Sequence, residues 1–62
     1  MKYSELKKLL KKNGCRLDHE GKRHEIWYSP ITGQQFTVGR HNSQDVVSGT
    51  LNSILKAAGI KK

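Results

Sequence analysis

Apolar residues recur with helical spacing near both ends of the chain. The segment YSELKKLLKKNG, residues 3–14, places apolar residues three or four positions apart and lysines on the remaining face, which is typical of an amphipathic helix. Ser4 or its neighbour is suited to cap the start of this helix. The segment SGTLNSILKAAG, residues 48–59, repeats the pattern, with Ser48 as a candidate cap and Gly59 as a left-handed stop. The sequence therefore predicts one helix near each end.

Three short segments between these helices alternate in polarity. They are CRLDH (15–19), HEIWYS (24–29) and QFTV (35–38), and period-2 alternation is typical of strands. The residues EGKR (20–23) have the length and the glycine of a hairpin loop. The segment SPITGQ (29–34) indicates a turn, because proline cannot donate to a ladder and glycine tolerates a positive φ.

The hairpin loop determines which side chains share a face of the sheet. A four-residue loop at 20–23 makes His19 and His24 the first cross-strand pair, with β-carbons roughly 5 Å apart. The same register gathers apolar residues on one face, Ile26 and Tyr28 among them. We expect that face to be the one that the helices cover.

Trp27 then lies on the opposite face of these strands, which the helices do not cover. There Trp27 either packs on the stem of Arg16 or offers a stacking surface to a partner. The register also sets Asp18 opposite Glu25, an unfavourable pair of like charges. A bulge or a longer loop is therefore an open alternative.

The predicted order of elements is α-β-β-β-α. Two amphipathic helices must bury their apolar stripes, and one face of a three-stranded antiparallel sheet accommodates both. The chain is therefore expected to be a single α+β domain over residues 1–62, with a double-stranded-RNA-binding-domain-like fold and one open sheet face.

The charge of the chain favours polyanionic partners. Lysine and arginine total 12 against 5 acidic residues, a formal net charge of +7 with neutral histidines. Such an excess suits nucleic acid, an acidic protein or anionic lipid. Only 6% of the residues are aromatic, so a large base-stacking platform is not expected. Charge alone separates neither RNA from DNA nor specific from non-specific binding.

The cysteine content and the short apolar runs indicate the cellular location of the protein. The single cysteine, Cys15, excludes an internal disulfide and has the pattern of a core residue. The longest apolar run near the basic N-terminus is Leu9-Leu10, too short for a secretory signal or a membrane span. We therefore expect a cytoplasmic protein that does not bind membranes.

The segment EGKRHEIWYSP, residues 20–30, carries the candidate chemistry. An imidazole such as that of His24 takes or gives a proton near neutral pH. Lys22 and Arg23 beside it would hold a phosphodiester and stabilise charge that develops on it. RNA supplies its own nucleophile, the 2′-hydroxyl group. One or two imidazoles with cations would therefore suffice to cleave RNA by internal transesterification.

Simpler interpretations compete at these positions. A histidine at a hairpin end is more often a solvated surface residue than a catalyst. His19 is either an edge-strand spacer or a helper acid, and His41 is most simply a solvated loop residue, with a phosphate contact as the second interpretation. The carboxylates of Asp18, Glu20 and Glu25 either orient the ring or offset the positive field. The lysines of the first helix are by default a solvent-facing stripe, and a surface that binds nucleic acid non-specifically is the second interpretation.

The chain lacks the residue spacings of common metal sites and nucleotide-binding loops. Ligand types occur at Cys15, Asp18, His19, His24 and His41, but without C-x₂-C or H-x₃-H spacing. The glycines are scattered, and none belongs to a G-x-x-x-x-G-K phosphate loop. We expect no metal site and no small-molecule cofactor.

Four blocks together resemble the HicA family of bacterial toxins in order and spacing. They are MKYSELKKLLKKNG (1–14), GKRHEIWYSP (21–30), FTVGRH (36–41) and SGTLNSILKAAGI (48–60). The last block is the most distinctive, since it is close to the family's usual ending GTLRSILKQAGI. The resemblance covers essentially the whole chain.

The resemblance implies a toxin that cleaves messenger RNA without a metal and independently of the ribosome. It also implies the double-stranded-RNA-binding-domain-like fold and a HicB antitoxin that masks the active site and usually represses the operon. The family's catalytic histidine follows a glycine-containing turn, which His24 and Gly21 match. Two departures are Lys22, where the family usually has serine, and Gly39 in VGRH, where VPRH is commoner.

The chain is therefore expected to be an endoribonuclease toxin in which His24 is the acid/base. Lys22, Arg23 and Arg40 are the expected phosphate-binding cations, and His19 and His41 are candidates for an assisting role. The alternatives are a non-catalytic module that binds the A-form grooves of double-stranded RNA and a small protein whose charge serves an acidic partner.

Overall fold

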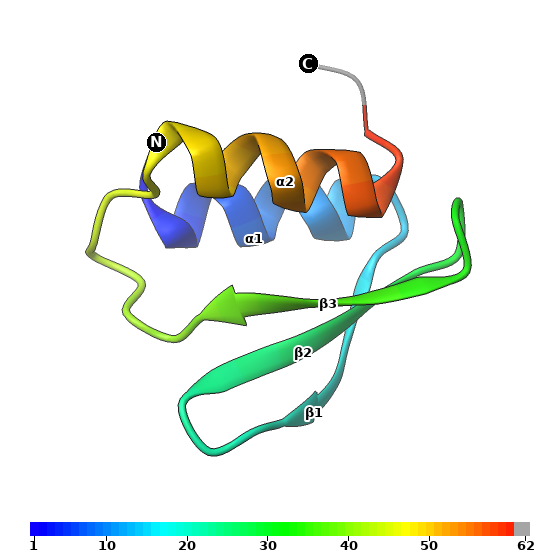
Figure 1. The fold of residues 1–62 in the computed structure, drawn as a ribbon, viewed down its shortest axis with the longest axis horizontal. Helices are drawn as coiled ribbons and strands as arrows, with labels where there is room; N and C mark the ends of the chain where they lie inside the picture. Colours follow the sequence, from blue (N-terminus) through cyan, green and yellow to red (C-terminus); the bar gives the residue numbers. More distant parts are fainter. Residues whose placement is uncertain (61–62) are drawn as a thin grey trace.

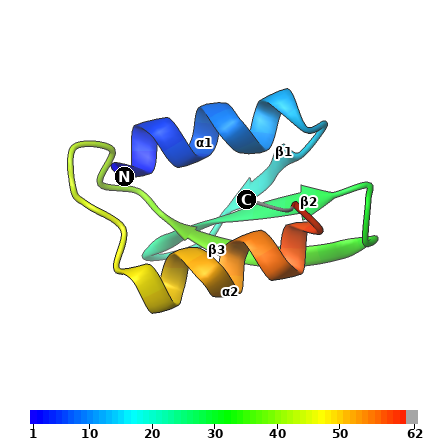
Figure 2. The same cartoon turned by 90° about the horizontal axis from the view of Figure 1, so that it is seen from above.

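A computed structural model describes residues 1–60 and confirms the predicted order of elements. The elements are α1 (Tyr3–Lys12), β1 (Arg16–Glu20), β2 (His24–Ser29), β3 (Gln34–Gly39) and α2 (Ser48–Ala58). The strands form one antiparallel sheet in the order β1-β2-β3. Both helices lie on the same side of this sheet (Figure 1), and the view from above shows α1 and α2 running along opposite margins of it (Figure 2). The fold is α+β and double-stranded-RNA-binding-domain-like.

The core lies between the sheet and the two helices. Leu6 and Leu10 of α1 and Ala58 of α2 have no exposed surface, and Trp27 of β2 is only 2% exposed. The other buried apolar residues are Cys15, Phe36, Val38, Val46, Leu51, Ile54 and Leu55. The apolar stripes of both predicted helices therefore face the sheet, and the prediction that Cys15 belongs to the core is confirmed.

The prediction of which face of β2 is covered is wrong. Trp27 is buried under the helices, whereas Ile26 and Tyr28 lie half-buried on the open face. Because three consecutive positions of β2 are large and apolar, either parity offers the core an apolar residue. The indole is the largest of the three side chains, and the covered face also supplies an acceptor for its N–H, described below. Arg16 stacks on Tyr28, with its guanidinium 5.2 Å from the ring centroid, and not on Trp27.

The predicted register of β1 and β2 is also wrong, because β1 contains a bulge. Leu17 pairs with Trp27, but His19 pairs with Ile26, so Asp18 is the extra residue. His19 and His24 are therefore not a direct cross-strand pair. A bulge inserts one residue and changes the parity of everything after it, and the alternating sequence alone does not show its position.

The hairpin loop is one residue shorter than predicted. Glu20 is the last residue of β1 and pairs with Glu25, so the loop consists of residues 21–23. The N–H of Gly21 donates to the carbonyl of His24 at 2.8 Å. The predicted register set Asp18 opposite Glu25, but in the structure Glu25 faces Glu20.

Ser4 does not cap α1. The N-terminal cap is Lys2, whose N–H donates to the carboxylate of Glu5, the neighbour of Ser4, at 3.1 Å. A distant loop accepts the next two N–H groups. The N–H groups of Tyr3 and Ser4 donate to the carbonyls of Gln44 and Asn42, at 3.0 and 3.1 Å. The first N–H groups of a helix have no partner within it, so the loop between β3 and α2 supplies the missing acceptors. This loop is consequently bound to the beginning of the chain.

The second helix ends as predicted but begins differently. Its N-terminal cap is Val47, so Ser48 is the first helical residue and not the cap. Gly59 adopts a left-handed φ of 76° at the other end, which confirms the predicted stop. Nearby, the buried hydroxyl of Ser29 donates to the carbonyl of Ala58 at 2.6 Å and joins the end of β2 to the end of α2.

Candidate active site

His24 is the first residue of β2 and its side chain is exposed. Successive side chains of a strand point to opposite faces. The next residue, Glu25, contacts α1 on the covered face, so His24 belongs to the open face. An imidazole in this position is accessible to a large substrate such as RNA.

The loop before His24 turns tightly and presents two cations. Lys22 and Arg23 are both exposed. A β-carbon on Gly21 would lie 3.1 Å from the carbonyl oxygen of His24, which is tighter than ordinary contact. Glycine at this position therefore lets the backbone close on itself directly before the histidine.

Arg40 joins this loop from the other side of β2. It follows Gly39, which pairs with His24 across the ladder. A guanidinium nitrogen of Arg40 donates to the carbonyl of Gly21. The contact spans 19 positions of sequence and brings a third cation to the loop that precedes His24.

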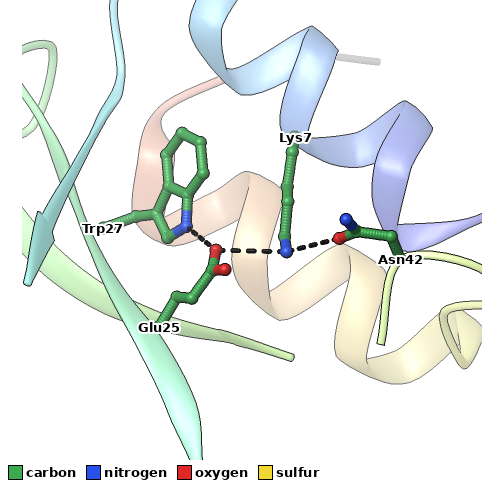
Figure 3. A network of polar contacts seen from close by, with 4 residues as sticks. All are labelled: Lys7, Glu25, Trp27 and Asn42. Carbon is green, nitrogen blue, oxygen red and sulfur yellow. Dashed lines mark hydrogen bonds and ion pairs between the residues drawn. The ribbon is translucent and has the colours of Figure 1, made fainter. Parts of the chain in front are cut away.

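A polar network lies under His24, on the covered face of the sheet. The carboxylate of Glu25 accepts the indole N–H of Trp27 at 2.9 Å and pairs with the ammonium of Lys7 at 3.1 Å. Lys7 also donates to the side-chain oxygen of Asn42 at 2.6 Å. Figure 3 shows the chain of contacts that results, from β2 through α1 to the loop after β3.

This network was missed at the sequence level. The sequence pattern predicts a solvent-facing Lys7, yet its side chain is only 12% exposed, and that of Glu25 is 16% exposed. A lysine on the same helical face as the buried Leu6 and Leu10 was a signal for an inward ammonium, but nothing in the sequence identified its partner. Glu25 cannot orient the ring of His24, because the two side chains leave β2 on opposite faces.

The pKa of Glu25 lies below its ordinary value. Burial on its own raises this pKa, but the hydrogen bonds from Trp27 and Lys7 and the charges of Lys7 and Arg40 outweigh that effect. The carboxylate is therefore held in its charged form between two cations. One of these cations, Arg40, is also the residue that contacts the hairpin loop.

The other two histidines occupy different surroundings. His19 lies on β1, exposed, with its Nδ1 atom 2.9 Å from the Asp18 carboxylate. The same carboxylate oxygen accepts a hydrogen bond from the amide of Gln35 at 2.9 Å. His41 is exposed in the loop after β3, where its backbone carbonyl accepts the N–H of Gln44.

A family model for the HicA toxin of bacterial toxin–antitoxin systems matches residues 3–60. The chain belongs to the HicA family. Membership in a family of toxin–antitoxin systems implies an antitoxin as partner of this HicA chain. Neither the search of curated proteins nor the search of solved structures found a match.

One departure of this chain from the usual HicA pattern has a structural reason. Gly39 stands where proline is commoner, and a β-carbon there would lie 3.0 Å from the ring of Tyr3. Tyr3 belongs to the first turn of α1, so the helix approaches the end of β3 closely. The glycine therefore accommodates Tyr3 directly before Arg40.

Within residues 1–60, no three His, Cys, Asp or Glu side chains form a group able to hold a metal ion. Neither helix in the described part of the chain is long and apolar enough to cross a membrane.

Proposed function

We propose that this chain is an endoribonuclease toxin that cleaves messenger RNA without a metal. His24 moves the protons of the reaction, and Lys22, Arg23 and Arg40 bind the RNA phosphates. A HicB-like antitoxin neutralises the toxin by covering this site. Family membership supports the toxin role, and the geometry around His24 supports the chemistry.

The single observation that carries the proposal is the hydrogen bond from Arg40 to the carbonyl of Gly21. It holds a guanidinium against the loop that presents Lys22 and Arg23, immediately before the exposed His24. A guanidinium has five N–H donors, so those not used by the Gly21 carbonyl are available to a phosphate. Cations from two separate parts of the sequence thus meet beside one accessible imidazole.

The proposed reaction needs no nucleophile from the protein. An imidazole removes the proton of the ribose 2′-hydroxyl, whose oxygen then attacks the adjacent phosphorus. The cations stabilise the charge that develops on the phosphate oxygens, and such preorganised stabilisation is often the largest catalytic contribution. The bond from phosphorus to the 5′-oxygen breaks, and that oxygen receives a proton.

The alternative is a module that binds double-stranded RNA without cleaving it. The fold and the net charge of +7 agree with this alternative, since such domains read the shape and the backbone of an A-form helix. The alternative requires no particular residue at position 24, whereas the nuclease requires an imidazole there.

The deciding experiment compares wild type with His24→Gln. We expect cleavage of RNA to fall about 10²–10⁴-fold, the usual contribution of a general acid or base, while RNA affinity stays within about twofold. His24 is exposed, so the variant should fold, and its melting temperature provides the control. Growth arrest on expression should be lost in parallel.

Three results would contradict the proposal. Absence of cleavage by the wild type would favour the binding module. Equal cleavage by both forms would remove His24 from the mechanism. Loss of wild-type cleavage in EDTA would show that a metal takes part.

A further inference from the structure

The bulge in β1 creates a second ordered imidazole on the open face of the sheet. On a regular strand the side chains of Asp18 and His19 would point to opposite faces. The extra residue at Asp18 removes this alternation. Asp18 reaches across β2 to Gln35, and its carboxylate lies 2.9 Å from Nδ1 of His19.

The two histidines share this face. His19 pairs with Ile26, and directly opposed residues of an antiparallel pair point to the same side. His24 lies two positions before Ile26 on β2, also on that side. The Cα atoms of diagonal neighbours of this kind are about 7–8 Å apart. Both histidines are exposed.

We propose that His19 is a second proton-transfer residue that protonates the leaving 5′-oxygen while His24 accepts the proton of the 2′-hydroxyl. This inference rests on the proposed ribonuclease function. Asp18 and Gln35 act as positioning residues, because the Asp18 carboxylate occupies Nδ1 of the ring and leaves Nε2 to face the substrate.

The proton balance of the step requires two groups or one group used twice. The bond between the 2′-oxygen and phosphorus forms as the bond between phosphorus and the 5′-oxygen breaks. One proton leaves the 2′-oxygen for His24, and one proton passes from the His19 imidazolium to the 5′-oxygen. The products are a 2′,3′-cyclic phosphate and a 5′-hydroxyl, and no oxidant or other co-reactant is needed.

The diagonal placement of the two histidines fits this division of roles. The attacking and leaving oxygens lie on opposite sides of the phosphorus in an in-line displacement. Two rings that touch could not flank a phosphate group, whereas diagonal neighbours leave room for one between them.

A substrate with a sulfur atom in place of the 5′-bridging oxygen tests the assignment. A thiolate leaves without protonation, so such a substrate does not need a general acid. We expect His19→Gln to slow cleavage of ordinary RNA about 10²–10⁴-fold and to recover most of this loss on the sulfur substrate. His24→Gln should be slow on both substrates, because the 2′-hydroxyl must still lose its proton.

Asp18→Asn provides a second, milder variant. It keeps the size of the side chain and the acceptor for Gln35 but removes the carboxylate beside His19. We expect a smaller loss on ordinary RNA than with His19→Gln, and the same recovery on the sulfur substrate. Asn52→Ala, at an exposed position of α2, is the control and should cleave both substrates like the wild type.

The outcomes separate this inference from the proposed function. Full activity of His19→Gln on ordinary RNA would overturn the role of His19 and leave the nuclease intact. An equal loss on both substrates would mean that His19 only supports the structure. If the wild type cleaved neither substrate, the proposed function itself would fail.

Discussion

Glu25 links β2 to α1 directly after the proposed catalytic residue. Its carboxylate accepts the indole N–H of the buried Trp27 and pairs with Lys7 of α1. The positive charge of Arg40 also lowers the pKa of this carboxylate. Because Lys7 also contacts Asn42, the strand that begins with His24 is joined to α1 and to the loop after β3. Glu25 therefore has a structural role, although it is the next residue after the proposed catalyst.

Replacement of Glu25 by glutamine should lower stability mainly at neutral pH. The folded pKa of Glu25 lies below its ordinary value of 4.5. Its ionised form therefore stabilises the fold above pH 4.5, and this contribution is lost as the pH falls through the lowered pKa. We expect Glu25→Gln to lose about 1–3 kcal/mol of unfolding free energy at neutral pH and much less in acid.

Urea unfolding at neutral pH and at a pH below the lowered pKa of Glu25 measures this difference. Lys7→Met and the double variant complete a mutant cycle, in which we expect the two neutral-pH losses to be less than additive because one ion pair is lost in both. Equal destabilisation by Glu25→Gln at both pH values would show that packing, and not charge, explains the effect.

At the scale of elements, helical periodicity was a better guide than strand alternation. Both helices lie within a residue or two of the predicted segments, because a stripe with 3.6-residue spacing has only one face to bury. The strand β2 has Ile26, Trp27 and Tyr28 in succession, so its pattern did not show which face is inside. The buried indole of Trp27 donates to Glu25, which pairs with Lys7, and only the tertiary structure brings Lys7 to β2.

The candidate site was predictable where it is local in sequence and unpredictable where it is not. The exposure of His24 beside Lys22 and Arg23 follows from a short polar loop before a strand. The contact of Arg40 with Gly21 depends on the pairing of β3 with β2, and the contact of His19 with Asp18 depends on a bulge. Their roles in catalysis remain predictions.

Two glycines, one in the first turn of α2 and one directly after its end, should respond to replacement by alanine in opposite directions. Gly49 lies in the first turn, where an added β-carbon meets no atom within 4 Å. Gly49→Ala should therefore stabilise the fold by about 0.4–1 kcal/mol, through lower entropy of the unfolded chain. Gly59 has a φ of 76°, and its added β-carbon would lie 2.8 Å from side-chain carbons of Ile31 and Thr32.

Gly59→Ala should therefore lower the free energy of unfolding by at least about 1–2 kcal/mol, the usual penalty when a residue other than glycine adopts a left-handed backbone conformation. Each kcal/mol corresponds to about 4–8 °C in melting temperature for a chain of this size, so thermal unfolding distinguishes the two variants. A rise in melting temperature for Gly59→Ala would show that the turn between β2 and β3 moves away from the helix end.

At the scale of the whole molecule, the excess positive charge is distributed over several surfaces. Lys22 lies in the loop beside His24, whereas Lys56 lies in the last turn of α2. Figures 1 and 2 both show the loop between β1 and β2 at the opposite end of the molecule from this turn. The two lysines therefore form a matched pair, since either substitution by glutamine lowers the net charge from +7 to 7 − 1 = +6.

Salt dependence of RNA binding should separate the two lysines. In a His24→Gln background, which prevents cleavage, Lys22→Gln should reduce the slope of log affinity against log salt by about 0.7, as expected for one lost phosphate contact to a single strand. Lys56→Gln should leave this slope unchanged. Equal changes for both variants would indicate diffuse binding to the whole positive surface.

The hydrogen bond between Ser29 and Ala58 bears on the moment at which the toxin acquires activity during its own synthesis. Translation produces β2 well before α2, so the strand that begins with His24 leaves the ribosome without the helix that later fastens its far end. Leu51 and Ile54 of the core are added late as well. Under the proposed function, the nascent polypeptide is therefore not expected to cleave RNA until α2 has been synthesised and has packed on the sheet.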